Sequence, residues 1–95
     1  MVLGVCHITL MLHDCHSLKG KRKVIKSVME KVKNRFNVSV AEVGSNDLWQ
    51  RAEIGVCVVG NDRAFINSVL DKVMNFVEGL ALAEVTGHDI ELINC

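Results

Sequence analysis

Basic side chains gather in one stretch of this 95-residue chain. Between Lys19 and Arg35 lie eight of the eleven Lys and Arg residues and a single acid, Glu30. That stretch carries a charge of about +7 and the remainder about −7, although the chain as a whole is neutral. Local cation clusters attract polyanions even when net charge is zero, so the pattern indicates a phosphate-binding surface.

Helical spacing brings five of these cations together. At about 100° per residue they fall within roughly a quarter of the helix circumference, opposite the apolar side. We name this set the basic ridge, and it consists of Lys19, Arg22, Lys23, Lys26 and Lys33. Four cations, Lys21 among them, crowd the first turn and a half, where the helix dipole disfavours each by roughly 0.3–1 kcal/mol. A bound phosphate would reverse that cost.

The only tryptophan, Trp49, stands two residues before Arg51. Such a pair in a loop could stack a nucleobase or hold a partner, and the alternative is an aromatic lid over the edge of the core. We predict binding of structured RNA, within a ribosomal particle. The predicted contacts are Lys19, Lys21, Arg22, Lys23 and Lys26, with Trp49 and Arg51 as secondary contacts. A solvated helix face built from good helix formers is the alternative explanation of the ridge.

Other residues of chemical interest form weaker patterns. His13, Cys15 and His16 are zinc-ligand types, but their spacing fits no closed four-ligand site, so we expect no metal or other cofactor. Cys57 and His7 could pair across central strands as a thiol and a base, yet no third group to orient the base can be named. We therefore interpret them as sheet residues and do not expect an enzyme.

Four strands and two helices would position these side chains. Ser17 and Asp62 are suitable helix N-caps, and Gly79 would close the second helix. A wide apolar stripe on that helix includes Phe65. The last strand is interrupted at 86–88, which predicts a bulge or a tight hairpin. The predicted strands are Val2–Leu12, Asn37–Val43, Ala52–Val59 and Leu82–Ile93, and the predicted helices lie near 18–35 and 62–79.

This β-α-β-β-α-β order predicts one α+β domain over residues 1–95, with the ferredoxin-like fold. Such a fold has a four-stranded antiparallel sheet with both helices on one face. The opposite face would be open and unusually apolar for a solvated surface. Its expected residues are His7, Thr9, Glu53, Gly55, Cys57 and Val59.

Composition narrows the setting in which the chain works. Apolar residues make up 49% and charged residues 23%, which is typical of a globular protein. The apolar run Val2–Leu12 is too short to span a bilayer, and four cysteines without a CxxC pair suit a reducing cytoplasm. The mean hydropathy of +0.27 exceeds what one small core can absorb, so we expect a homodimer or higher oligomer, formed through the open face or the second strand's edge.

Three segments together carry a family resemblance. They are Ser17-Leu18-Lys19 with Lys21-Arg22, Phe36-Asn37-Val38-Ser39-Val40-Ala41-Glu42-Val43, and Asp47-Leu48-Trp49-Gln50-Arg51-Ala52. On these the chain resembles the YlxP-like bacterial family, small proteins of unknown function. The resemblance implies a ferredoxin-like fold and a cytoplasmic protein, often encoded near genes of transcription elongation and translation initiation. It implies no catalytic residue, and His13 to His16 are not part of the resemblance.

Two classes of function remain open from the sequence. The first is an RNA- or ribosome-associated accessory protein that uses the basic helix. The second is a small acylphosphatase-like enzyme, or a ligand-binding or oligomeric regulatory domain. An acylphosphatase-like enzyme would need a glycine-containing loop with an arginine directly after the first strand. Here that loop reads His13-Asp14-Cys15-His16, so binding is the favoured prediction.

Overall fold

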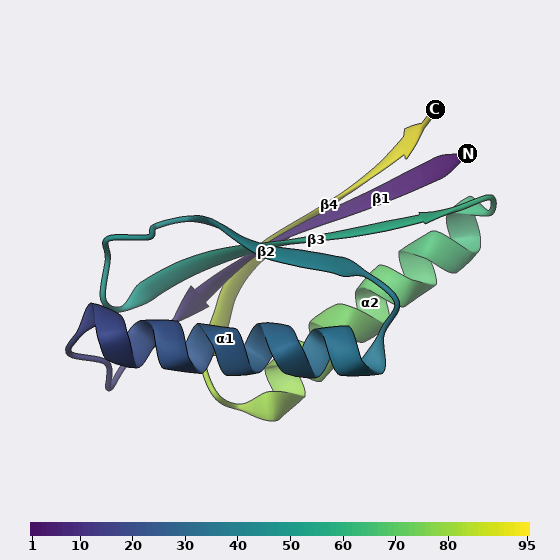
Figure 1. Ribbon diagram of the computed structural model, residues 1–95. Coiled ribbons are helices and arrows are strands. Elements are labelled where there is room, and N and C mark those ends of the chain that lie inside the picture. The colour runs from purple at the N-terminus through teal and green to yellow at the C-terminus, as the bar shows by residue number, and fades with distance from the viewer.

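The computed structural model describes all 95 residues and has the predicted order of elements (Figure 1). Ser17 caps the first helix by accepting a hydrogen bond from the Gly20 N–H at 3.0 Å, and Asp62 caps the second through the Ala64 N–H at 3.1 Å. Both predicted N-caps are confirmed. The elements are β1 (Val2–Met11), α1 (Leu18–Arg35), β2 (Ser39–Gly44), β3 (Arg51–Gly60), α2 (Arg63–Leu80) and β4 (Glu84–Asn94).

The four strands form one antiparallel sheet in the order β2-β3-β1-β4. Both helices lie on the same side of it (Figure 1). This arrangement confirms the predicted α+β ferredoxin-like fold. The β1–β4 register shifts where Thr9 and Leu10 face Gly87 and Val85, so the predicted interruption of the last strand is a bulge.

The core lies between the sheet and the helices, because alternate strand residues point to opposite faces. Gly4 has no room for a Cβ, since the Ile66 side chain of α2 lies directly over it. Neither helix is long and apolar enough to cross a membrane. The fully buried apolar side chains include Ile8 and Leu10 of β1, Ile54 and Val56 of β3, Ile25, Val28 and Val32 of α1, and Ile66, Leu70 and Val73 of α2.

Several local predictions need correction. Phe65 was expected in the apolar stripe of α2, but it is 64% exposed, because it lies in the first turn beyond the reach of the sheet. Gly79 does not end α2. Leu80 still packs against the core, so the helix continues and Ala81 takes the left-handed conformation with φ of 54°. Strand boundaries differ from the prediction by one or two residues, as expected for element ends.

The two helices touch near the C-terminal end of α1. There the rings of Phe36 and Phe76 meet edge to face, with centroids 5.6 Å apart, and the Arg35 guanidinium lies 5.3 Å from the Phe76 centroid. At the other end of α1 a hollow separates Gly20 and Val24 from the α2–β4 connection. The first turns of α1 therefore lie at an open end of the molecule, beside the β2–β3 loop (Figure 1).

Candidate nucleic-acid interface

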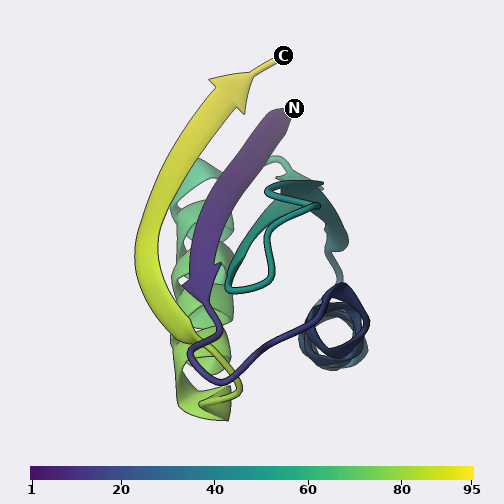
Figure 2. The ribbon, with the colours of Figure 1, turned by 90° about the vertical axis from the view of Figure 1, so that its left-hand side faces the viewer.

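All five cations of the basic ridge are exposed, as the helical spacing predicted. Lys26 lies 4.0 Å from Glu30, and both of these side chains are mostly exposed, so the pair contributes little. No other ridge cation has an acidic partner within ion-pair distance. Seen along its axis, α1 stands at one corner of the molecule, with its outer side free of other elements (Figure 2). The ridge is therefore accessible to a partner along the helix.

The start of α1 combines these cations with a helix N-terminus. Its first turn contains no acidic residue. Because the dipole already makes this end positive, Lys19, Arg22 and Lys23 add charge where nothing in the protein neutralises it. An anion here would meet backbone N–H groups and side-chain cations at once.

Lys21 does not belong to this surface, which corrects the prediction that it contacts RNA. Its side chain is 1% exposed, and Nζ donates to the Ser45 carbonyl and lies 3.3 Å from Glu42 Oε2. The Glu42 contact is at ion-pair distance but outside hydrogen-bond geometry, so charge attraction holds that pair. Lys21 therefore fastens the start of α1 to the end of β2 and is unavailable to a ligand.

Trp49 lies in the β2–β3 loop with 53% of its surface exposed, so it is not a lid over the core. The loop is held at both ends. Ser45 adopts a left-handed φ of 57° and accepts from the Leu48 N–H at 3.1 Å. Gln50 accepts from the Leu12 N–H at 2.8 Å and donates its side-chain amide to the Cys15 carbonyl at 3.4 Å. These bonds place Trp49 at the same end of the molecule as the start of α1.

A polar chain that the sequence reading missed continues from this loop onto the open face of the sheet. The Ser45 hydroxyl donates to Glu53 Oε2 at 2.5 Å, and Glu53 Oε1 lies 3.0 Å from His7 Nε2. The Ser45 hydrogen bond lowers the pKa of Glu53, helped by the charges of Arg51 and His7 and opposed by partial burial. Arg51 lies 4.0 Å from the same carboxylate and is half exposed, so its guanidinium stays open to solvent.

The proposed thiol and base pair has no support in the geometry. His7 is bonded to Glu53, whereas the Cys57 thiol makes no hydrogen bond. All four cysteines are free, and burial, with smaller contributions from Asp71 and Asp89, raises the pKa of the Cys6 thiol to about 11. A thiol in that state is a poor nucleophile.

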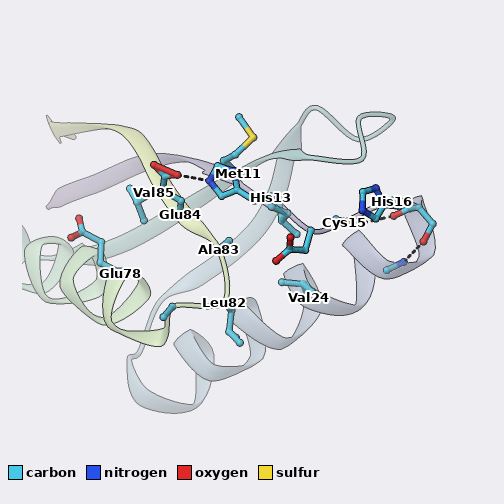
Figure 3. Close-up of a pocket in the computed structure, with 15 residues that line it drawn as sticks. Met11, His13, Cys15, His16, Val24, Glu78, Leu82, Ala83, Glu84 and Val85 are labelled. Atoms are coloured by element: carbon cyan, nitrogen blue, oxygen red, sulfur yellow. Dashed lines mark hydrogen bonds and ion pairs between the residues drawn. The ribbon is translucent and has the colours of Figure 1, made fainter.

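A second feature borders the ridge, and we name it the acidic hollow (Figure 3). Its volume is about 940 Å³, and Leu12, Val24 and Leu82 contribute apolar wall. Its charged lining consists of Asp14, Glu78 and Glu84. The lining contains no Lys or Arg, so it lacks the cation that an acylphosphatase-like site would need to hold an anion.

His13, Cys15 and His16 also line this hollow, but they do not converge. His13 Nε2 bonds Glu84 Oε2 at 2.5 Å, and the Cys15 thiol donates to the Ser17 carbonyl at 3.2 Å (Figure 3). No group of three or more His, Cys, Asp or Glu side chains has a geometry that could hold a metal ion.

Comparison with known proteins gives the family. The model of a family described as "Protein of unknown function (DUF503)" matches residues 3–90. The chain belongs to this family. It is 34% identical over 85 residues to the uncharacterized protein YlxP of Bacillus subtilis (strain 168), which covers 90% of this chain and 92% of that protein. The matched residues include both the basic ridge and the Trp49 loop.

Solved structures support the fold. The de novo designed protein Foldit4 superposes with a TM-score of 0.55 at 14% identity, covering 100% of this chain and 99% of its own. SnoaB, a cofactor-independent oxygenase from Streptomyces nogalater, superposes with a TM-score of 0.50 at 9% identity, covering 99% of this chain and 92% of its own. At such identities these likenesses concern the fold alone.

Proposed function

We propose that the protein binds structured RNA through the basic ridge, as an accessory protein of a ribosomal particle. The observation that supports this most is the unneutralised charge at the start of α1. Lys19, Arg22 and Lys23 are exposed, have no acidic partner and lie at the positive end of a helix. Folding does not require that arrangement, and phosphates would stabilise it.

Backbone phosphates are the expected contacts, because lysines along a helix read charge and not base edges. Sequence preference should then be slight. If about four phosphates are contacted, the slope of log K against log salt is roughly −3 for a single strand and somewhat steeper for a duplex. The alternative, a solvated helix face, predicts no binding beyond a weak general attraction.

A quadruple replacement tests the proposal. Changing Lys19, Arg22, Lys23 and Lys26 to Gln should abolish binding to ribosomal particles and to RNA at low salt. Thermal stability should stay unchanged or rise slightly, because the changes remove cations from the wrong end of a dipole. The measurements are co-sedimentation with ribosomal subunits, fluorescence anisotropy with labelled RNA, and thermal melting.

A matched variant separates the ridge from net charge. Its four replacements by Gln are at exposed cations outside the ridge, namely Lys31, Arg35, Arg63 and Lys72. This control should retain most of the affinity, because those cations face other directions. Equal losses in the two variants would mean that charge alone matters. A parent protein that never binds would leave the ridge as a solvated face.

We also propose self-association through the open face of the sheet. Val43 and Val59 lie on that face and are 56% and 59% exposed. Val43 also covers Gly55, whose added Cβ would lie 3.0 Å from it, so the apolar surface is continuous across β2 and β3. Replacing Val43 and Val59 by Lys should weaken dimers about tenfold or more in sedimentation velocity, whereas Phe65→Lys, an equally exposed site on α2, should not. A parent monomer at tens of micromolar would contradict this.

A further inference from the structure

Trp49 is exposed for no reason that folding supplies. The eighteen-residue core is complete without it, and no aromatic or cationic partner lies on its ring. Leu48 beside it is also 51% exposed. Two large apolar side chains in water at the tip of a connection cost the protein solvation free energy that burial would recover. Such an exposed pair marks a contact surface.

The position of Trp49 is fixed by bonds that reach it from three elements. Lys21 of α1 donates to the Ser45 carbonyl at the beginning of the loop. At the end of the loop, Gln50 bonds both the end of β1, through Leu12, and the connection to α1, through Cys15. A loop held this way presents its aromatic ring without a large ordering cost when a ligand binds.

A second hollow, of about 650 Å³, lies against the indole. Gln50 and His16 bring groups that can donate or accept hydrogen bonds, and Arg51 brings a half-exposed guanidinium. Asp47 is its one carboxylate, which disfavours a phosphate there but can accept from a base amino group. We name this hollow the Trp49 hollow. Its lining is Met11, His16, Asp47, Leu48, Trp49, Gln50 and Arg51.

We infer that the Trp49 hollow holds one unpaired nucleobase of the RNA whose backbone lies on the basic ridge. This inference rests on the proposed function and names the class of RNA: a single strand, or a structured RNA with an unpaired nucleotide. The base stacks on the indole, and the neighbouring phosphates lie towards Lys19 and Lys23 of α1. A duplex cannot enter, because its bases are already stacked and paired.

Charge favours RNA over a protein partner at this end. The hollow is bordered by the unneutralised cations of α1, and Arg51 adds a further cation next to the ring. An aromatic ring with cations around it is the arrangement that binds single-stranded nucleic acid. A protein that used Trp49 as an apolar anchor would gain nothing from those cations.

Intrinsic fluorescence tests the inference directly, because Trp49 is the only tryptophan. The probes are a short single-stranded RNA and a fully paired duplex of the same length, titrated into the full chain at low salt. Stacking should quench the indole emission with the single strand. The duplex should bind the ridge and leave the emission unchanged.

Two substitutions give the energetic test. Trp49→Leu keeps an apolar side chain but cannot stack, so affinity for the single strand should fall by about 5- to 100-fold, as for loss of one stacked base. Trp49→Phe should retain most of the affinity. Duplex affinity should be the same in the parent and both variants, and thermal melting should show that each folds.

The outcomes distinguish this inference from the proposed function. If RNA binds and the ridge variant loses it, but Trp49→Leu binds the single strand as the parent does and emission never changes, the base site is wrong and the ridge stands. If no RNA binds at all, both are wrong. If Trp49→Leu changes only the sedimentation of the protein itself, the indole is a protein contact, and the base site is again wrong.

Discussion

Two surfaces of opposite charge share the first turns of α1. The basic ridge faces outward with Lys19, Arg22 and Lys23, whereas Gly20 and Val24 of the same turns line the acidic hollow. The ridge has cations with almost no acidic neighbours. The hollow has three carboxylates and no Lys or Arg. One helix end therefore separates an anion-attracting surface from an anion-repelling one.

The difference teaches where a polyanion can and cannot lie. Phosphates on the ridge are attracted by the side chains and by the helix dipole, but phosphates in the hollow would meet Asp14, Glu78 and Glu84. The hollow thus acts as a boundary that directs a bound strand along the ridge and towards Trp49. The net charge of the chain, which is zero, conceals this division completely.

The largest expected effect sharpens the contrast within the helix, between Lys21 inside and Lys23 outside. Lys21→Ala leaves Glu42 without its cation and the Ser45 carbonyl without its donor, so we expect a loss of about 2–3 kcal/mol in the free energy of unfolding. Lys23→Ala removes only an exposed side chain and should change it by less than about 0.5 kcal/mol. Urea unfolding followed by circular dichroism measures both.

A paired variant shows whether the effect comes from the buried charge. Lys21→Met combined with Glu42→Leu removes both charges and should recover more than half of the stability that Lys21→Ala loses. Equal stability of Lys21→Ala and Lys23→Ala would contradict the buried role of Lys21 and return its side chain to the exposed surface.

Helical geometry alone contained the correction for Lys21. At about 100° per residue it lies about 200° from Lys19, in the middle of the apolar stripe near Val28 and Val32. A cation at that angle needs a buried partner, but the sequence cannot say which acid supplies it, because Glu42 comes from a strand twenty-one residues further on. The ridge itself was predictable, since its exposure depends only on one helix.

The strands were predictable for the same local reason, because alternation of apolar residues assigned the buried faces of β1 and β3 correctly. The hollows were not. The acidic hollow combines residues near 13 with residues near 84, and the exposure of Trp49 depends on bonds from three elements. Contacts between distant segments fix both features, and no spacing in the sequence reports them.

The smallest expected effect tests the boundary role of the acidic hollow. Replacing Asp14 by Asn, and Glu78 and Glu84 by Gln, removes three negative charges beside the start of α1. We expect RNA affinity to rise about two- to fivefold at 50 mM salt, because exposed charges within a Debye length of roughly 10 Å still act on the bound phosphates. Fluorescence anisotropy with the single-stranded RNA measures the change.

The salt dependence of this variant decides how the gain arises. Its log–log slope should equal that of the parent, because the slope counts phosphates neutralised by cations and the ridge is unchanged. A matched control removes three exposed acids elsewhere, by Asp71→Asn, Asp89→Asn and Glu91→Gln, and should gain less. Equal gains would mean that net charge acts at long range and that the hollow sets no boundary. A loss of affinity in the hollow variant would mean that the strand contacts the hollow itself, and the path from the ridge to Trp49 would have to be redrawn through it.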